Sequence, residues 1–306
     1  GCRVRGLARY SVDTGTILCP PVSAMSMRPT DLGVANCDLA RELAPSGGGG
    51  QAGPFKHVIS LGCRCTQASV LRSLKQRRYA CPFDWVFCSA QMVAHCLADD
   101  FAAFLDRSQF YLVATVRDAT GLPAGSPPRE RNLIGHRLYS DMMQGVGRGS
   151  IFNHRDPLNC DEDYLYTRRT VDRLRCVLAS NDRKLFAVMN INKQLWIERD
   201  LRALFGVLLK RTANFVLVAV DCDKKLGPRA QGLRPQLLAE EFAQQGELQL
   251  WRLPCVGENT GSYFRDDFDA ERIRGLLLEP FTFDLADDPL EEEQLQRQQQ
   301  RQQQQQ

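Results

Sequence analysis

The stretch FVLVAV, residues Phe215–Val220, decides the fold class of this 306-residue chain. All six side chains are apolar, and no polar residue alternates with them. An unbroken apolar run of this length is typical of a strand that is buried on both faces. Such strands occur in parallel sheets that helices cover on both sides, so the stretch indicates a layered α/β fold.

Similar short apolar runs alternate with amphipathic segments along the chain. His57–Leu61, Leu185–Met189 and Leu248–Leu253 predict further strands, and Ser150–Asn153 predicts a short one. The helical spacing of apolar residues predicts helices after Gly62 and over Ala90–Leu105, Asp161–Ser180, Leu201–Leu208, 234–245 and Asp269–Leu278. Because strands and helices alternate, we predict a three-layer, Rossmann-like α/β fold with a mostly parallel sheet.

Composition indicates a single folded domain with unstructured ends. The chain carries 39 Lys plus Arg against 36 Asp plus Glu, a net charge of +3 that argues against a nucleic-acid scaffold. Its apolar runs are far shorter than the ~20 residues of a membrane helix, so no membrane partner is expected. We predict a disordered extension and Gly-rich linker over 1–54, one domain over 55–289 with an insertion or lid at 118–150, and a disordered Gln-rich tail over 290–306.

Twelve cysteines are a generous number for this length, but they contain no Cys-x-x-Cys pair. A chain of this size can build a core without disulfides, so we expect free thiols that fill the core in a reducing, cytoplasmic compartment. The set Cys63, Cys65, Cys81 and Cys88 has no common zinc-site spacing, and neither a metal nor another cofactor is expected.

Cys65 stands out among the twelve because of its local sequence, ISLGCRCT. It follows a predicted strand and Gly62, and it lies at or beside the start of the next predicted helix. Amide N–H groups and the positive end of a helix dipole stabilise a thiolate at such a position. Considered alone, these residues still favour a cysteine packed under the sheet over a nucleophile.

Two short motifs give a resemblance to a known family. They are Leu61-Gly62-x-x-Cys65 and Pro82-Phe83-Asp84-Trp85, followed by Asp100-Phe101 and by Phe152-x-His154. With these residues the chain resembles the putative papain-like cysteine peptidase family, a domain of unknown function. The resemblance is good from about Pro54 to Asn190 and covers the last third of the domain only in outline.

The resemblance implies that Cys65 is a nucleophile and His154 its general base. A Cys–His pair is reactive because the imidazole takes the thiol proton, which leaves a nucleophilic ion pair near neutral pH. The residue that orients His154 stays open: Asp84 and Asn190 are favoured about equally, and Asp156 less. Asp84 could equally have a folding role, by capping a turn or by pairing with Arg72 or Arg78.

These residues predict a thiol-dependent hydrolase or acyl transferase that acts on a peptide, amide or ester carbonyl. Arg72, Arg168 and Arg169 are candidate ligands for an anionic part of a peptide or small-molecule substrate. The alternatives are a non-catalytic α/β module that binds an anionic glycan or sugar phosphate, and a glycan-modifying transferase. A clamp of arginines would suit either of these alternatives.

Overall fold

The computed structural model describes residues 53–118, 129–143, 149–190, 198–222, 226–258 and 263–291. The predicted N-terminal extension and linker, apart from Gly53 and Pro54, and the Gln-rich tail from residue 292 onward lie outside these residues. Within the described part of the chain, no helix is both long and apolar enough to cross a membrane.

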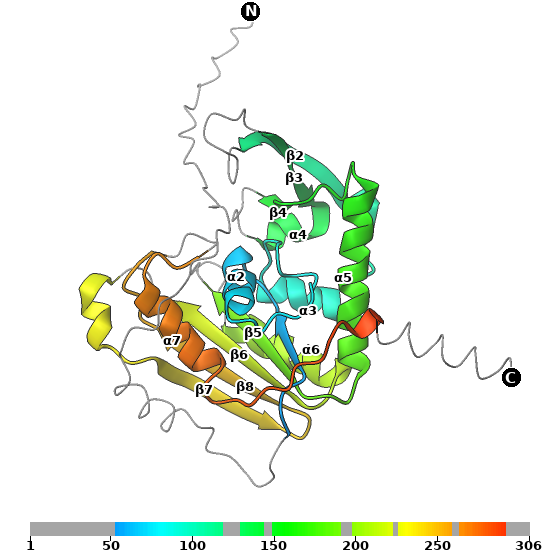
Figure 1. Cartoon of the computed structure of the whole chain (residues 1–306). Helices are drawn as coiled ribbons and strands as arrows, with labels where there is room; N and C mark the ends of the chain where they lie inside the picture. Colours follow the sequence, from blue (N-terminus) through cyan, green and yellow to red (C-terminus); the bar gives the residue numbers. More distant parts are fainter. Residues whose placement is uncertain are drawn as a thin grey trace, which may run out of the picture.

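A five-stranded sheet forms the centre of the molecule (Figure 1), in the order β1-β5-β6-β8-β7. Strands β1, β5, β6 and β8 are parallel, and only β7 runs antiparallel, beside β8 at one edge. The strands are β1 (His57–Ser60), β5 (Lys184–Asn190), β6 (Phe215–Cys222), β7 (Gln236–Ala243) and β8 (Gly246–Leu253). All residues of β1, β5 and β6 are buried, as the unbroken apolar runs predict.

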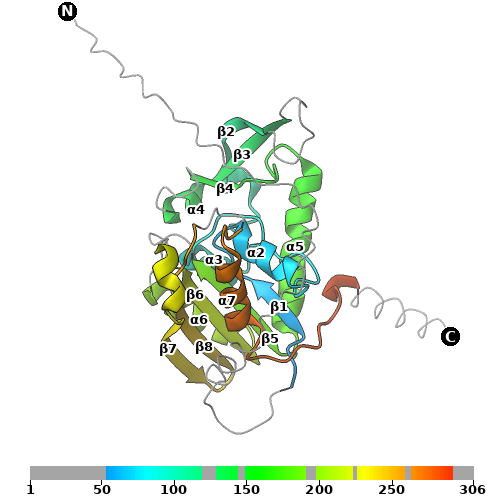
Figure 2. The same ribbon diagram turned by 60° about the vertical axis from the view of Figure 1, so that its left-hand side comes forward.

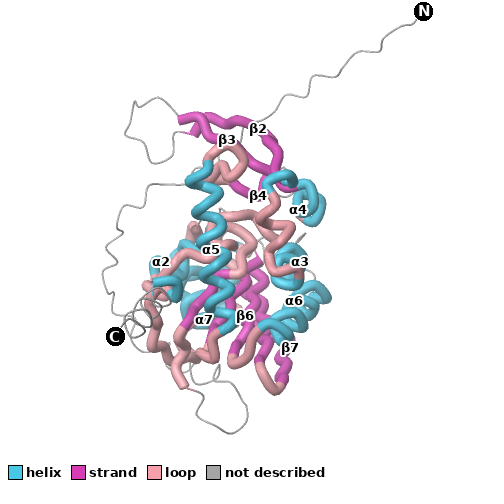
Figure 3. Tube along the Cα trace, turned by 90° about the vertical axis from the view of Figure 1, so that its right-hand side faces the viewer, coloured by secondary structure: helices cyan, strands magenta, loops and turns pink. Residues whose placement is uncertain are grey.

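Helices cover both faces of this sheet (Figure 3). On one face, Val216, Val218 and Val220 of β6 pack in a core with α2 (Cys65–Ser73) and α7 (Asp267–Leu277). On the other face, Leu217 and Ala219 pack in a core with α3 (Ala90–Ala98), α5 (Asp161–Ala179) and α6 (Glu198–Arg211). The prediction of a three-layer α/β fold with a mostly parallel sheet is therefore confirmed.

A second, smaller sheet lies at one end of the large one (Figures 1 and 2). Its three antiparallel strands are β2 (Phe110–Asp118), β3 (Arg129–His136) and β4 (Ser150–Phe152), with α4 (Arg137–Met142) between the last two. Two short 3-10 helices, Arg107–Gln109 and Gly227–Gly232, complete the elements that the structure describes. Strand β3 and helix α4 thus fall within the predicted 118–150 insertion, whose role as a lid stays a prediction.

The helix predicted over 234–245 is wrong, because these residues form strand β7. Residues Gln236–Ala243 pair with β8 from Gln236 opposite Arg252 to Ala243 opposite Gly246. The segment LLAEEFA has a high intrinsic helix propensity, but pairing with β8 completes that strand's outer row of backbone hydrogen bonds. An ion pair between Glu241 and Arg202 of α6 also fixes the strand to the helix layer.

The helix predicted over Ala90–Leu105 begins as expected but ends early, at Ala98. Beyond it, the Asp99 carboxylate accepts hydrogen bonds from the N–H groups of Phe101 (3.0 Å) and Ala103 (2.9 Å). Asp100 and Phe101 take positive φ values of 51° and 63°, which end a right-handed helix. Phe101 is nevertheless fully buried.

Candidate active site

A tight turn at the carboxyl end of β1 places Cys65 at the first residue of α2. Gly62 has a φ of 91°, and a Cβ atom on it would overlap the sulfur of Cys88. Only glycine fits both this conformation and this space. Arg64, at the N-cap position, has extended backbone and makes no side-chain capping hydrogen bond. Cys65 therefore lies where the sequence predicts it, at the positive end of the α2 dipole.

His154 reaches Cys65 from the small sheet. It follows β4 by two residues, and its Nε2 lies 3.1 Å from the Cys65 sulfur. The thiol is buried, with 4% of Cys65 exposed, whereas His154 is exposed, so the pair is accessible from the imidazole side. The two residues are 89 positions apart, and the structure brings them within hydrogen-bond distance.

Trp85 of the Pro82-Phe83-Asp84-Trp85 segment packs beside this pair. Its ring meets the His154 imidazole edge to face, with centroids 6.0 Å apart. The Arg77 guanidinium lies over the Trp85 ring at 5.5 Å from its centroid. These two contacts restrict the position of the indole and imidazole rings.

Asp84 is engaged by other groups. It is almost fully buried and accepts hydrogen bonds from Arg77 Nε (2.7 Å) and from the Cys81 N–H (2.9 Å). Burial raises the pKa of this carboxyl, although the Arg77 charge opposes the shift. These bonds support the folding role considered from the sequence, with Arg77 as the partner in place of the expected Arg72 or Arg78.

The other two candidates for orienting His154 also have partners elsewhere. Asn190, at the carboxyl end of β5, donates from Nδ2 to Asp221 Oδ1 on β6 (3.1 Å). Asp156 accepts hydrogen bonds from Asn132 Nδ2 (2.8 Å) and from the Asn159 N–H (3.0 Å). Which residue orients the imidazole stays a prediction.

The three arginines proposed as substrate ligands are not gathered at the Cys–His pair. Arg72 lies in the last turn of α2, two turns from Cys65, and Arg168 and Arg169 lie side by side on α5. All three are exposed, and none forms a side-chain hydrogen bond or ion pair within the described ranges. Their role in binding an anion stays a prediction.

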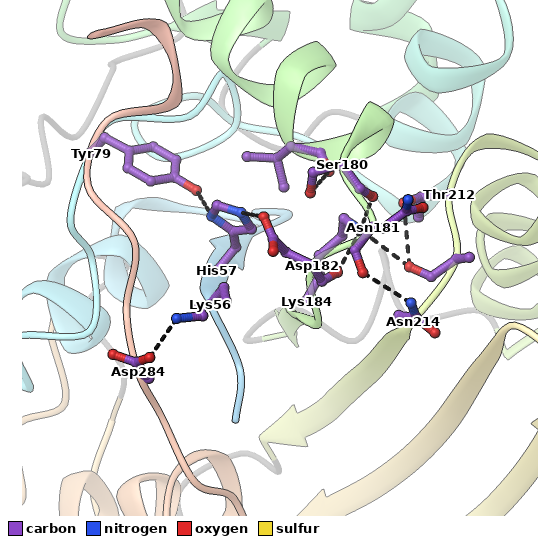
Figure 4. Close-up of polar contacts among 12 residues, drawn as sticks. Lys56, His57, Tyr79, Ser180, Asn181, Asp182, Lys184, Thr212, Asn214 and Asp284 are labelled. Carbon is purple, nitrogen blue, oxygen red and sulfur yellow. Dashed lines mark hydrogen bonds and ion pairs between the residues drawn. The ribbon is translucent and has the colours of Figure 1, made fainter. Parts of the chain in front are cut away.

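The remaining three histidines lie away from Cys65. His57 is buried at the start of β1, at the amino end of the parallel strands, whereas Cys65 follows their carboxyl end. Its Nδ1 lies 2.7 Å from Tyr79 Oη and its Nε2 lies 3.2 Å from Asp182 (Figure 4). His95 Nδ1 lies 3.0 Å from Tyr139 Oη, and His136 Nε2 lies 2.9 Å from the Ala103 carbonyl oxygen. Each of these three histidines has a structural contact.

Most of the described cysteines other than Cys65 are buried core residues. All nine described cysteines are free, and only Cys160 and Cys176 among them are not buried. Burial raises the pKa of the Cys81, Cys88 and Cys96 thiols, so they stay protonated at neutral pH. Within the described ranges, no group of three His, Cys, Asp or Glu side chains is placed to hold a metal ion.

Gln67, in the first turn of α2, is a polar residue near the site that the sequence analysis missed. It is 1% exposed, and its Oε1 accepts a hydrogen bond from the Met189 N–H (2.9 Å), which leaves a buried Nε2 donor without a protein partner. The sequence contains a signal for this residue: Gln67 lies four residues before Leu71, so it is a polar residue on the apolar stripe of a predicted helix.

An α/β fold with a thiol at a helix start and an imidazole nitrogen 3.1 Å away has the components of a thiol hydrolase. Residues 56–130 match the model of the family described as putative papain-like cysteine peptidase, so the predicted resemblance is confirmed for this part of the chain. The matched segment includes Cys65 and ends before His154. Comparison with curated proteins and with solved structures gives no match.

Proposed function

We propose that the protein is a thiol-dependent hydrolase or acyl transferase in which Cys65 attacks a carbonyl carbon and His154 is the general base. The observation that carries the proposal is the 3.1 Å distance between the Cys65 sulfur and His154 Nε2. This distance allows the imidazole to take the thiol proton directly as the sulfur attacks.

The reaction has two halves. The sulfur bonds to the carbonyl carbon, the leaving amine or alcohol takes the proton from His154, and a thioester on Cys65 remains. Water or a second nucleophile then attacks the thioester and gives its proton to His154; the C–S bond breaks, and the departing sulfur takes the proton from His154 to restore the thiol. In this proposal, N–H groups at the start of α2 stabilise the oxyanion in both halves.

Alkylation by iodoacetamide at pH 7, followed by peptide mass spectrometry, tests the nucleophile. Cys160 is a built-in reference, because it is more exposed than Cys65 and its sulfur donates to Glu162 (3.2 Å). We expect Cys65 to react at least tenfold faster than Cys160, although Cys65 is the more buried thiol. Replacement His154→Gln is expected to remove this advantage without unfolding the protein, since His154 is exposed.

A Cys65 that reacts no faster than Cys160 in the native protein would contradict the proposal. The same holds if His154→Gln leaves the rate of Cys65 alkylation unchanged. Near-native thermal denaturation of the variant is the control that separates loss of the base from loss of the fold.

A further inference from the structure

The segment Asp84–Cys88 pairs with the strand that precedes His154. Val86 forms an antiparallel bridge with Phe152 of β4, and the next backbone N–H of the segment donates to the carbonyl oxygen of Ile151 (2.9 Å). The bridge lies two residues before His154. Because backbone hydrogen bonds fix the register of the two chain segments, the place where the chain leaves β4 depends on the segment.

The same segment contacts the turn before Cys65. The Cys88 N–H donates to the Cys63 carbonyl oxygen (3.3 Å), and the Cys88 thiol donates to the Leu61 carbonyl oxygen (3.5 Å). One short stretch of chain is thus bonded both to β4 and to the turn that leads into α2. Its position therefore affects the 3.1 Å distance between the Cys65 sulfur and His154 Nε2.

Trp85 is the side chain of this segment that contacts the base. Its ring meets the His154 imidazole edge to face, and the Arg77 guanidinium lies over the same indole. Arg77 Nε also donates to the Asp84 carboxylate (2.7 Å). Contacts therefore run from Asp84 through Arg77 and Trp85 to the imidazole.

Asp84 anchors this series of contacts. Its carboxylate is 1% exposed and also accepts a hydrogen bond from the Cys81 N–H (2.9 Å), which closes the turn that leads into Trp85. A buried carboxylate needs a charged partner, and the largely buried Arg77 supplies it. The planar guanidinium can bond to Asp84 and stack on the indole at once, which a lysine ammonium cannot do.

We propose that Trp85 is a positioning residue for His154, and that Asp84 acts on the reaction through Arg77 and Trp85 rather than by contact with the imidazole. This inference rests on the thiol-hydrolase function proposed above. An aromatic edge contact restricts the plane of an imidazole without occupying either ring nitrogen. His154 can then exchange a proton with the thiol while its ring stays in place.

The pH dependence of Cys65 alkylation by iodoacetamide tests this role. With the imidazole in place, the midpoint of the rate should lie below the ordinary thiol pKa of about 8.5. Trp85→Leu removes the ring, and we expect the midpoint to rise by about one pH unit and the rate at pH 7 to fall by about five- to tenfold. Trp85→Phe keeps an aromatic edge, so its rate at pH 7 should stay within about twofold of that of the natural protein.

Arg77→Lys tests the connection to Asp84. Lysine keeps a charge beside Asp84 but loses the planar stack on the indole, so the midpoint should rise, by less than in Trp85→Leu. Because Arg77 acts through Trp85, the two shifts should not add. The double variant should have the midpoint of Trp85→Leu alone.

Phe205→Leu is the matched control for the loss of an aromatic ring. Phe205 lies on α6 and packs on Phe215 at the amino end of β6, whereas Cys65 follows the carboxyl end of the parallel strands. This variant should lower the melting temperature and leave the midpoint of Cys65 alkylation unchanged. It separates a general loss of stability from a displaced imidazole.

A midpoint that Trp85→Leu leaves unchanged, or that Phe205→Leu raises equally, would overturn the inference, while rapid alkylation of Cys65 would still support the enzyme. Additive shifts in the double variant, or a Trp85→Phe midpoint as high as that of Trp85→Leu, would overturn it as well. Should Trp85→Leu not fold, an unchanged midpoint in Arg77→Lys has the same meaning. If Cys65 of the natural protein reacts no faster than Cys160, the proposed function fails, and the positioning role fails with it.

Discussion

Gly62 determines where the Cys65 thiol lies, because the turn has no room for a side chain at position 62. The sulfur of Cys88 occupies the volume that any other side chain at position 62 would need, and this sulfur also donates to the Leu61 carbonyl oxygen (3.5 Å). The turn before Cys65 is thus packed directly against Cys88, which follows the Pro82–Trp85 segment.

A double-mutant cycle can measure this packing. Gly62→Ala should lower the free energy of unfolding by more than the ~1–2 kcal/mol expected of positive φ alone, because the new methyl group overlaps Cys88. Adding Cys88→Ala removes the overlap, so the double variant should be at least ~1 kcal/mol more stable than additivity predicts. Urea unfolding of the four proteins gives the coupling energy, and a value near zero would show that the overlap is relieved in another way.

Cys65 and His154 could be predicted as site residues from the sequence, but the side-chain contacts around them could not. Cys65 could be singled out because a strand, a glycine and a helix start leave a recognisable order, and His154 because of the family resemblance. The partner of Asp84 could not be chosen, because Arg72, Arg77 and Arg78 all lie close to it in sequence. Only the folded chain shows that the Arg77 side chain reaches both Asp84 and Trp85.

At the scale of elements, burial separates the predictions that are confirmed from those that are wrong. The strands β5 and β6 are buried throughout, so their sequences carry an unambiguous apolar run. Strands β2 and β3 are half exposed; β3 has a mixed composition, whereas Phe110–Ala114 of β2 is an apolar run that the sequence analysis did not assign to a strand. In β7, pairing with β8 overrides a local helix preference, and the periodicity of the sequence does not report such pairing. Three large apolar side chains of this strand are exposed: Leu237, Leu238 and Phe242.

His136 joins the small sheet to the helix layer. It is the last residue of β3, is fully buried, stacks on Tyr139 of α4 with centroids 4.3 Å apart, and binds the Ala103 carbonyl oxygen. Burial lowers its pKa below the ordinary 6.5, although Asp106 and Asp99 partly oppose the shift. This connection therefore depends on a neutral imidazole.

The pH dependence of stability follows from the direction of this shift. Below pH 6.5 the unfolded chain binds a proton at His136 that the native state resists, so acid favours unfolding. We expect the free energy of unfolding of the natural protein to fall, relative to that of His136→Phe, as the pH decreases from 7.5 through 6.5. Urea titrations at several pH values measure the difference, and parallel curves for the two proteins would contradict it.

At the scale of the whole molecule, a polar cluster lies at the amino end of the parallel strands, whereas Cys65 follows their carboxyl end (Figure 4). The buried Lys184 ammonium donates to the carbonyl oxygens of Ser180 (2.7 Å), Asp182 (2.7 Å) and Ala213 (3.2 Å). Ser180 ends α5 and Ala213 follows α6, so one side chain fixes two helices to the start of β5.

Burial lowers the pKa of Lys184 to about 8. The unfolded chain keeps this proton up to about pH 10.5, so between these values the native state holds fewer protons and gains stability as the pH rises. Relative to Lys184→Met, the natural protein should therefore gain about 2–3 kcal/mol between pH 8 and pH 10.5. Lys56→Met, which removes a 38% exposed ammonium from the same cluster, is the control.

The Cys65–His154 pair joins α2, which covers the large sheet, to the segment after β4 of the small sheet, across 89 positions of sequence. Such a contact is costly in loop-closure entropy and forms only when distant parts of the chain have met. The Cys65 thiol should therefore become reactive only after the two sheets have docked. During refolding, rapid alkylation of Cys65 would mark the moment at which α2 and the segment after β4 come together.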